Sequence, residues 1–290
     1  MKIRVLVTGS NGQLGKTLKH LFFVNQDNIE FNFFDKNKLD ITSEKSLRNK
    51  FSNKEFQFCI NCAAYTNVEL AETEEENAFL VNAYAVKTLA LVCKEFNVVL
   101  IHISTDYVFD GLKMKPYTVE DITDPINIYG KSKRQGEIYL EGILNEYYII
   151  RASWLYSIFN KNFLKTIVSK INQNLDLNIT TEQTGTPTSC EDLSYFIYFI
   201  IKEKIPFGTY HFSAQGSGTW FDFAKQISIN FKNYDPYKLK EVQSYISKAA
   251  RPKRSVLDLS KTEKAYKKLN MWETSVKHTV LQIRSKLSLL

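Results

Sequence analysis

The fold follows from Ile3-Arg4-Val5-Leu6-Val7-Thr8-Gly9-Ser10-Asn11-Gly12-Gln13-Leu14-Gly15. The apolar residues Ile3 to Val7 predict a short buried strand, and a helical pattern through Leu18 and Phe22 follows the glycines. A strand, a glycine-rich turn and a helix in this order form the setting of a dinucleotide-binding fingerprint. Glycine permits the tight turn and lets the backbone approach a pyrophosphate at the helix N-terminus. The spacing is Gly-x-x-Gly-x-x-Gly, and a glycine turn that binds no ligand is the alternative interpretation.

The rest of the chain repeats this alternation of strands and helices. We expect strands at 2–8, 30–35, 57–62, 98–104 and 146–152, with helices at 12–24, 43–52, 74–96 and 128–145. Such a pattern is typical of an α/β fold with a doubly wound parallel sheet, the Rossmann arrangement. Further strands are expected at 177–181 and 208–212, and further helices at 160–173, 191–204, 219–231 and 259–288. We therefore predict a dinucleotide-binding domain of residues 1–153 with about 177–215, and a smaller α/β substrate-binding lobe of about 154–176 with 216–290.

Composition limits the possible functions. The chain has 290 residues, of which 44% are hydrophobic and 24% charged, and its net charge of +7 suits an anionic ligand such as a dinucleotide or a nucleotide sugar. The lysines are spread along the sequence without a basic aromatic block, so we expect no nucleic-acid partner. The sequence shows no secretory signal and no apolar stretch long enough for a bilayer, so we expect a cytoplasmic protein without a membrane partner. Its 4 cysteines do not form a disulfide pattern.

Two segments in the middle of the chain indicate chemistry. Ser104-Thr105-Asp106-Tyr107-Val108-Phe109-Asp110-Gly111 follows an apolar strand, and Tyr129-Gly130-Lys131-Ser132-Lys133 opens a helix. Tyr129 and Lys133 are four residues apart, so they share one helix face. A phenol can donate a proton to a developing alkoxide, and a nearby ammonium makes that phenol more acidic. These residues therefore predict carbonyl reduction, with a hydroxyl of Ser104 or Thr105 holding the carbonyl oxygen, whereas His102 is interpreted as a hydrogen-bonded strand residue.

These and other motifs resemble those of the extended short-chain dehydrogenases, and within them the dTDP-4-dehydrorhamnose reductases. The matching segments are Gly9 to Gly15, Asp40-Ile41-Thr42, Asn61 to Thr66, Ser104 to Gly111, Tyr129 to Lys133, Arg151 to Tyr156, Gln183 to Thr188, Gly208 to His211 and Arg251 to Ser255. The segments that begin at Ser104 and Arg151 are the most specific to the reductases. The resemblance covers most of the chain.

The resemblance implies hydride transfer from a reduced nicotinamide to the C4 ketone of dTDP-4-dehydro-6-deoxy-L-mannose, which gives dTDP-L-rhamnose. The alternatives are a reductase or an epimerase of a related nucleotide 4-keto-sugar, and a non-catalytic dinucleotide-binding regulatory subunit. A dehydratase would add an acidic pair beside the central hydroxyl residue, whereas Thr105-Asp106-Tyr107 offers one carboxylate. A regulatory subunit does not need the tyrosine and lysine that are both present here.

Carried over by position, the resemblance also implies the site residues. Tyr129 would be the general acid, Lys133 its partner and a ligand of the nicotinamide ribose, and Thr105 the carbonyl holder. The implied cofactor-binding residues are Gly9, Asn11, Gly12, Gln13, Leu14, Asp35, Asp40, Ile41, Ala63, Ala64, Tyr65, Tyr129 and Lys133. The implied substrate-binding residues are Thr105, Asp106, Tyr107, Trp154 and Arg251. For Trp154 and Arg251 the alternatives are a core residue between the lobes and a surface cation.

Three further expectations concern the cofactor and the assembly. Asp35 lies twenty residues after Gly15, where a carboxylate can bind the adenosine ribose, while Lys36 and Lys38 could receive a 2′-phosphate. We therefore favour NADPH and leave NADH open. Some relatives bridge subunits through Mg²⁺ held by a glutamate after the glycine turn, where this chain has Lys16-Thr17. We therefore predict no metal and no such dimer, and leave a monomer and a homodimer open.

Overall fold

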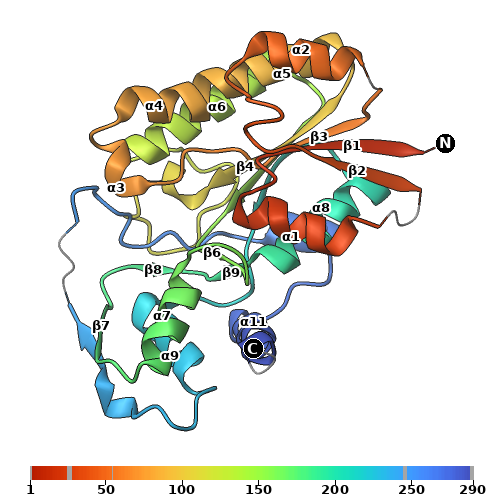
Figure 1. The fold of residues 1–290 in the computed structure, drawn as a ribbon. Coiled ribbons are helices and arrows are strands. Elements are labelled where there is room, and N and C mark those ends of the chain that lie inside the picture. Colours follow the sequence, from red (N-terminus) through yellow and green to blue (C-terminus); the bar gives the residue numbers. More distant parts are fainter. Residues whose placement is uncertain (1, 25–27, 54, 244–246, 288–290) are drawn as a thin grey trace.

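The centre of the molecule is a sheet of six parallel strands in the order β10-β5-β4-β3-β1-β2 (Figure 1). The structure, a computed structural model, describes residues 2–24, 28–53, 55–243 and 247–287. The strand bounds are β1 Ile3–Thr8, β2 Ile29–Phe33, β3 Phe58–Asn61, β4 Val99–Thr105, β5 Tyr147–Ala152 and β10 Gly208–Phe212. The winding direction reverses at β1, which lies between β2 and β3. Open α/β sheets bind ligands at such a point, outside the carboxyl ends of the strands.

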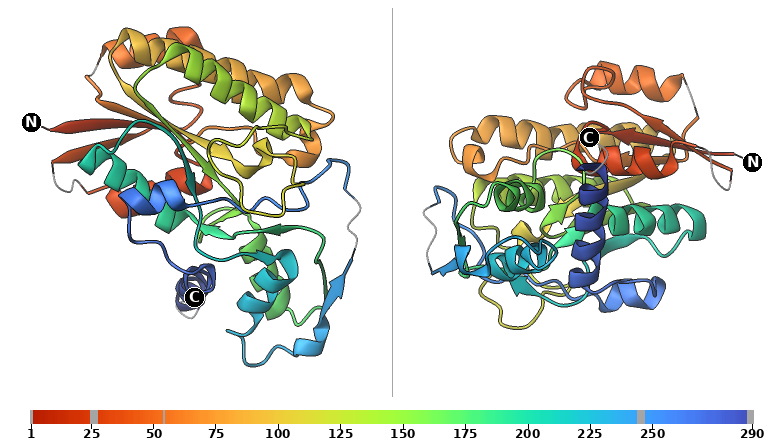
Figure 2. Two further views of the ribbon diagram at one scale, coloured as in Figure 1. Left: turned by 180° about the vertical axis from the view of Figure 1, so that it is seen from behind. Right: turned by 60° about the horizontal axis from the view of Figure 1, so that its bottom comes forward.

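Helices cover both faces of this sheet (Figures 1 and 2). Alternate residues of a strand point to opposite faces, so Val5 and Val7 pack against α1 and α8, whereas Leu6 packs against α2, α5 and α6. The helix bounds are α1 Gln13–Phe22, α8 Cys190–Glu203, α2 Glu44–Ser52, α5 Ala85–Glu95 and α6 Ile128–Ile143. Burial on both faces explains why the central strands β3, β4 and β5 are largely apolar. The predicted doubly wound α/β fold is confirmed.

A continuous helical run lies between β3 and β4. It consists of α4 Glu75–Phe79, the π-helical turn η1 Leu80–Tyr84 and α5, and the short helix α3 Val68–Ala71 precedes it. Asn82, in the π-helical turn, accepts a hydrogen bond from the Tyr65 N–H at 2.9 Å and donates to the Tyr65 carbonyl at 3.0 Å and to Ser132 Oγ at 3.0 Å. This side chain therefore ties the loop after β3 to α6.

A smaller lobe lies below the sheet in Figure 1. Its apolar core includes Leu164, Leu177, Phe223 and Val276. Its helices are α7 Phe163–Asn172, α9 Trp220–Ser228 and α11 Trp272–Leu287, and its parallel two-stranded sheet is β7 Leu177–Thr180 with β12 Leu239–Val242. The short pairs are β6 Leu155–Tyr156 with β9 Thr188–Ser189, and β8 Thr184–Gly185 with β11 Gly218–Thr219. The short helices are η2 Asp106–Val108, η3 Pro236–Lys238 and α10 Ser260–Ala265.

The structure differs from the sequence-based expectation in two places. Residues 177–180 form a strand, but it pairs with β12 in the smaller lobe and not with the large sheet, because strand composition does not specify a pairing partner. The helix expected at 259–288 is two helices, α10 and α11. Tyr266 packs on Phe196 in the large core, whereas Trp272 packs on Phe223 in the smaller one, so the chain must leave the helix between them.

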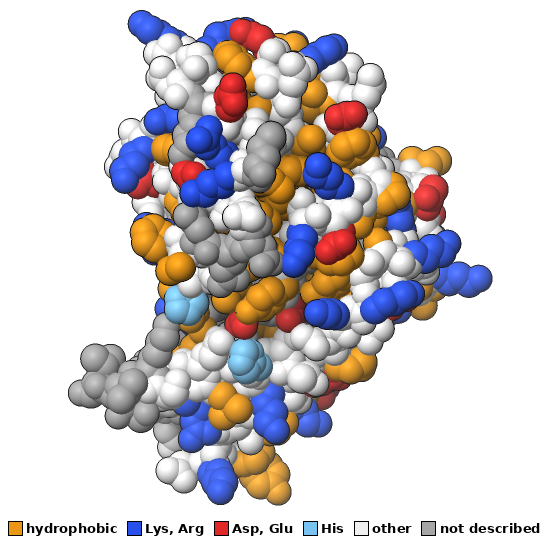
Figure 3. All heavy atoms as spheres, turned by 90° about the vertical axis from the view of Figure 1, so that its right-hand side faces the viewer, with side chains coloured by type: hydrophobic (Ala, Val, Ile, Leu, Met, Phe, Trp, Pro, Cys, Tyr) orange, Lys and Arg blue, Asp and Glu red, His pale blue; other side chains and the backbone are white. Residues whose placement is uncertain are grey.

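The surface carries mixed charges on the face shown in Figure 3. Lys and Arg side chains lie scattered among acidic and apolar ones there. No helix in the described parts of the chain is long and apolar enough to cross a membrane.

Candidate active site

The glycine turn between β1 and α1 has the shape that a pyrophosphate needs. Gly9 has φ +61°, and a Cβ there would lie 2.6 Å from the Ala63 nitrogen. A Cβ at Gly15 would lie 2.5 Å from the Gly9 carbonyl oxygen. Gly12 caps α1 without a side-chain hydrogen bond, and the first turn holds no acidic residue. The N–H groups and positive dipole end of α1 therefore remain available to an anion, so these residues fit a dinucleotide.

Asp35 lies beside this turn, just after β2. The Asn11 amide donates to Asp35 Oδ2 at 3.2 Å, and the Lys38 N–H donates to Asp35 Oδ1 at 3.1 Å. Asp40 accepts hydrogen bonds from the Thr42 N–H and hydroxyl at 2.9 and 2.8 Å. Ile41 points away from the crevice, because its side chain is buried in the core beneath α2 and α5. Asp35 thus lies within reach of the glycine turn, whereas the Ile41 side chain lies in the core.

The smaller lobe is tied directly to the glycine turn through the loop between β6 and α7. Asn160, with φ +54°, donates to the Asn11 carbonyl at 2.8 Å and accepts from Lys16 Nζ at 2.7 Å. Gln13 Oε1 accepts a hydrogen bond from Asn162 Nδ2 at 2.9 Å. These contacts close one side of the crevice with residues that the sequence did not single out.

Tyr129 and Lys133 come together at the carboxyl end of β4. Asn127 caps α6 by accepting from the Gly130 N–H at 2.7 Å, which places Tyr129 in the first turn. A Cβ at Gly130 would lie 2.2 Å from the Tyr107 carbonyl oxygen, so glycine lets α6 approach the loop after β4. Tyr129 hydrogen-bonds Thr105, and the Tyr107 and Tyr129 rings meet edge to face with centroids 5.8 Å apart. The predicted trio of Tyr129, Lys133 and Thr105 is therefore assembled at one place.

Burial sets the protonation of these groups. Burial raises the pKa of Tyr129 above its usual value, although the Thr105 hydrogen bond opposes this. Burial lowers the pKa of Lys133 to about 8, and Lys133 Nζ donates to the Ile103 carbonyl at 2.6 Å. Tyr129 thus retains its proton at neutral pH, whereas Lys133 titrates close to neutral pH.

Asp106 is a buried carboxylate next to this trio. It accepts a hydrogen bond from Ser255 Oγ at 2.5 Å and one from Thr105 Oγ1 at 3.1 Å. Burial raises the pKa of Asp106 to about 6. These bonds anchor the segment around Ser255 and orient Thr105, so Asp106 holds the loop after β4 in place.

Arg251 lies on the rim and already has partners. Its Nη2 donates to Glu69 Oε1 at 2.6 Å, and its Nη1 lies 3.5 Å from the Tyr107 hydroxyl. Although burial opposes ionisation of Glu69, its hydrogen bonds from Arg251, Ser247 and the Lys248 N–H hold the pKa at about 2. Arg251 is therefore a positioned cation and not a free surface residue.

Trp154 lies near the carboxyl end of β5. It follows β5 with φ +45° and stacks on Trp220 of the smaller lobe, with ring centroids 3.7 Å apart and 6° between the planes. A Cβ at Gly185 would lie 2.6 Å from the Trp154 indole, so glycine makes room for that ring. Trp154 is thus half-buried between the lobes and also faces the crevice.

One pocket of about 500 Å³ joins these parts. The predicted residues in its wall are Gly12, Gln13, Leu14, Ala64, Thr105, Asp106, Tyr107, Tyr129, Lys133, Trp154 and Arg251. Its wall also contains Ser104, together with residues that were not predicted, namely Cys62, Thr66, Val68, Ile103, Ala152, Leu155, Asn160, Lys161 and Trp220. The predicted residues outside the wall are Gly9, Asn11, Asp35, Asp40, Ile41, Ala63 and Tyr65. Ser104 had been named as an alternative carbonyl holder, whereas Trp220 and Lys161 carry no local signal in the sequence.

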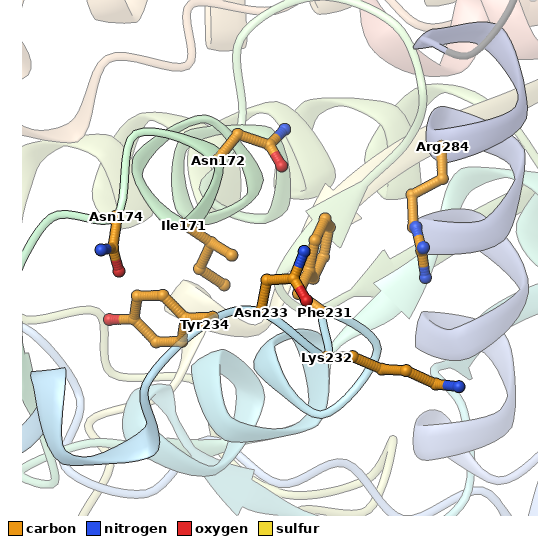
Figure 4. A pocket seen from close by; sticks show the side chains of 8 residues that line it. All are labelled: Ile171, Asn172, Asn174, Phe231, Lys232, Asn233, Tyr234 and Arg284. Carbon is orange, nitrogen blue, oxygen red and sulfur yellow. The ribbon is translucent and has the colours of Figure 1, made fainter.

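A second groove lies in the smaller lobe, away from these residues. It is lined by Ile171, Asn172, Asn174, Phe231, Lys232, Asn233, Tyr234 and Arg284 (Figure 4). Arg284 donates to the Asn230 carbonyl and lies over the Phe231 ring. None of the predicted site residues contributes to this groove. Within the described residues, no group of three or more His, Cys, Asp or Glu side chains is placed to hold a metal ion.

Comparison with known proteins identifies the family. The family model described as the RmlD substrate binding domain matches residues 1–285. The dTDP-4-dehydrorhamnose reductase of Sinorhizobium fredii is 32% identical over 96% of this chain and 97% of the relative. The dTDP-4-keto-6-deoxy-D-glucose reductase of Streptomyces niveus is 34% identical over 84% of each chain. The crystal structure of the Bacillus anthracis dTDP-4-dehydrorhamnose reductase in complex with NADP superposes with a TM-score of 0.92, at 34% identity over 97% of this chain and 100% of that one. The chain therefore belongs to the dTDP-4-dehydrorhamnose reductase family of the extended short-chain dehydrogenases.

Proposed function

We propose that the protein reduces the C4 ketone of dTDP-4-dehydro-6-deoxy-L-mannose to give dTDP-L-rhamnose, with Tyr129 as the general acid. One observation carries this proposal. A single pocket is lined at once by the glycine turn, by Tyr129 and Lys133, and by the Trp154 and Arg251 wall. Cofactor residues, proton donor and substrate wall thus surround one space that can hold a nicotinamide and a sugar side by side.

The dinucleotide would be held by the open N-terminus of α1, by Gly12, Gln13 and Leu14, and by Asp35 at the ribose. When bound, the reduced nicotinamide supplies the hydride. Lys36 and Lys38 follow Asp35 within three residues and could neutralise a 2′-phosphate, and the Bacillus anthracis relative carries NADP in its crystal structure. We therefore favour NADPH over NADH.

Tyr129 would give its hydroxyl proton to the C4 oxygen as that oxygen becomes an alkoxide. A raised pKa keeps this proton in place at neutral pH until the alkoxide, a much stronger base, accepts it. The Lys133 ammonium would stabilise the resulting tyrosinate. Thr105 donates to Asp106 in this structure, so its hydroxyl would turn towards the carbonyl oxygen when substrate enters.

The walls of the pocket would choose and shield the substrate. The stacked Trp154 and Trp220 line the pocket and would contact the deoxysugar, and Arg251 would offer a planar cation suited to a diphosphate. The two lobes meet across this space, so water would be excluded from the reacting atoms when both ligands are present. We also propose that the protein is cytoplasmic and that it is a monomer or a homodimer.

A reductase of a related nucleotide 4-keto-sugar is the second candidate. It is favoured by the 34% identity to a reductase of dTDP-4-keto-6-deoxy-D-glucose, which differs in sugar stereochemistry. An epimerase and a non-catalytic regulatory subunit remain as weaker alternatives.

The test is to mix purified protein with each of the two dTDP-4-keto sugars and to follow NADPH and NADH absorbance, with NMR of the sugar product. The proposal expects oxidation of the cofactor with the L-mannose-configured ketone and dTDP-L-rhamnose as product. Faster turnover of the D-glucose-configured ketone would favour the second candidate. Tightly bound NAD with no net oxidation would indicate an epimerase, and cofactor binding without turnover a regulatory subunit.

A further inference from the structure

A chain of buried polar side chains runs beneath the carboxyl ends of three strands and reaches Lys133. It links Thr8 of β1, Asn61 of β3 and His102 of β4, which are 0%, 1% and 0% exposed, to Lys133 of α6, which is 2% exposed. Thr8 Oγ1 donates to Asn61 Oδ1 at 2.7 Å, Asn61 Nδ2 lies 3.1 Å from His102 Nδ1, and His102 Nε2 lies 3.4 Å from Lys133 Nζ. The strand register places Thr8 beside Asn61 and Asn61 beside His102.

The hydrogen bonds at Asn61 determine which way its amide points. Its Oδ1 accepts from the Thr8 hydroxyl and also from the Ala63 backbone N–H at 3.3 Å. A backbone N–H can only donate, so a rotated amide would set its NH₂ group against that donor. Asn61 Nδ2 therefore donates to His102 Nδ1.

This donation determines the tautomer of His102. Burial, together with the charge of Lys133, holds the pKa of His102 well below its usual value, so the ring is neutral. A neutral imidazole with an accepting Nδ1 carries its single proton on Nε2. The His102 Nε2–H group therefore points at Lys133 Nζ.

An N–H group in this place favours one form of the lysine. An ammonium has three donors and no acceptor, so it meets the His102 Nε2–H as a second donor. A neutral amine can accept from His102 Nε2–H with its lone pair and still donate to the Ile103 carbonyl, which lies 2.6 Å away. The other titratable groups that act on Lys133 are Glu137 and Cys62, and Tyr129 lines the same pocket. The Glu137 charge is already shared by Arg151 at 2.8 Å and Arg134 at 3.1 Å.

We propose that His102 is a positioning residue that destabilises the ammonium form of Lys133, so that the lysine releases a proton readily next to Tyr129. The effect of His102 on Lys133 does not depend on the proposed function, but the use of the lysine proton does rest on it. After Tyr129 has given its proton to the sugar alkoxide, Lys133 can return a proton to the tyrosinate oxygen: one N–H bond breaks, one O–H bond forms, and the amine that remains accepts a hydrogen bond from His102 Nε2–H. Solvent then restores the lysine proton.

The proposal predicts two spectroscopic results that do not depend on turnover. In the ¹⁵N NMR spectrum of the full chain, His102 should show a protonated Nε2, an unprotonated Nδ1 and no titration near neutral pH. The ¹³Cε signal of Lys133, assigned by its loss in Lys133→Met, should titrate near pH 8.

Substitutions at His102 separate this role from simple packing. His102→Gln can keep an acceptor towards Asn61 and an N–H donor towards Lys133, so the Lys133 midpoint should stay close to that of the wild type. His102→Met removes the donor that opposes the ammonium form, so the midpoint of the Lys133 titration should rise by about one pH unit. The basic limb of the pH profile for kcat should move upward with it. His211→Gln alters a different buried histidine, on β10, and should change neither.

Asn61→Asp is the second test, because it reverses the hydrogen bond. An aspartate oxygen accepts from His102 Nδ1–H, which leaves Nε2 as an acceptor for the Lys133 ammonium. The ¹⁵N spectrum should show the exchanged tautomer, and the Lys133 midpoint should rise. A wild-type His102 protonated on Nδ1, or a Lys133 midpoint that is the same in wild type, His102→Met and Asn61→Asp, would overturn the proposal. If the wild-type protein gives the expected NMR results but does not reduce the dTDP-sugar, only the proposed function is contradicted.

Discussion

Trp154 and Trp220 stack face to face, with ring centroids 3.7 Å apart. Trp154 follows β5 of the large sheet, and Trp220 begins α9 in the smaller lobe. Trp154 holds φ +45°, a conformation that costs a bulky residue about 1–3 kcal/mol and persists only when its surroundings determine it. The stack therefore fixes the two lobes to each other at the wall of the pocket.

Trp220→Ala should weaken substrate binding more than cofactor binding. The change removes one wall of the pocket and the support of Trp154, so KM for the dTDP-sugar should rise about tenfold, the equivalent of 1.4 kcal/mol. Steady-state kinetics and NADPH titration measure both quantities. Trp220→Phe, which keeps an aromatic face, is the control. An equal loss of NADPH affinity would contradict a substrate-side role.

Arg251→Ala should also raise KM for the dTDP-sugar. A charge-assisted hydrogen bond is worth about 1.5–3 kcal/mol, so the increase should be roughly ten- to hundredfold, with NADPH affinity unchanged. Lys253→Ala, at an exposed position two residues later, is the matched control for charge. If both variants change KM equally, the effect comes from net charge and not from the position of Arg251.

Gly12 and Gly15 of the turn should not respond alike to alanine. A Cβ at Gly15 would lie 2.5 Å from the Gly9 carbonyl oxygen and 2.6 Å from Ser10 Cα, so Gly15→Ala must displace backbone and should cost about 1–3 kcal/mol in the free energy of unfolding. A Cβ at Gly12 meets only the Gly9 oxygen, at 3.2 Å. Gly12→Ala should therefore keep its thermal stability but lose NADPH affinity, because the methyl group enters the pocket. Thermal melts and NADPH titration separate the two effects, and an equally unstable Gly12→Ala would contradict this account.

Asp106 should make stability depend on pH. Burial raises its pKa to about 6, so the folded state prefers the protonated form, and the stability that this contributes is present below about pH 4 and lost as the pH rises through about 6. Relative to Asp106→Asn, the wild type should lose roughly 2–3 kcal/mol of unfolding free energy between pH 4 and pH 7. Denaturant unfolding at several pH values measures this difference.

Asp121 provides the control for that prediction. The Lys113 hydrogen bond and the Thr118 N–H lower the pKa of Asp121, so Asp121→Asn should show a small trend of the opposite sign. A difference between wild type and Asp106→Asn that is constant with pH would contradict the assignment of a raised pKa to Asp106.

Local patterns were enough to predict the parts of the site that depend on short spacings. The glycine turn depends on neighbours within one strand-turn-helix unit, and Tyr129 and Lys133 share a face because they are one helical turn apart. The loop after β4 could also be placed near the glycine turn, because parallel strands end at a common edge of the sheet. The structure brings all of these to one pocket.

Residues that act through tertiary contacts could not be predicted in this way. Trp220 reaches the pocket only because α9 packs against α7, and Asn160 reaches the glycine turn only through the contact between the lobes. Ile41 adjoins Asp40 in sequence, yet its apolar side chain lies in the core. The role of His102 follows from hydrogen bonds that cross three strands, and strand composition alone carries no information about them.

The central claim is that Tyr129 donates the proton to the sugar oxygen. Its most direct test is a single-turnover measurement of NADPH oxidation by wild type and Tyr129→Phe with saturating dTDP-4-dehydro-6-deoxy-L-mannose. Tyr107→Phe serves as a control, because its ring lies edge to face against Tyr129. The account predicts that Tyr129→Phe binds NADPH normally but oxidises it about 10²- to 10⁴-fold more slowly, whereas Tyr107→Phe keeps most of the rate. An unchanged rate in Tyr129→Phe would contradict the claim.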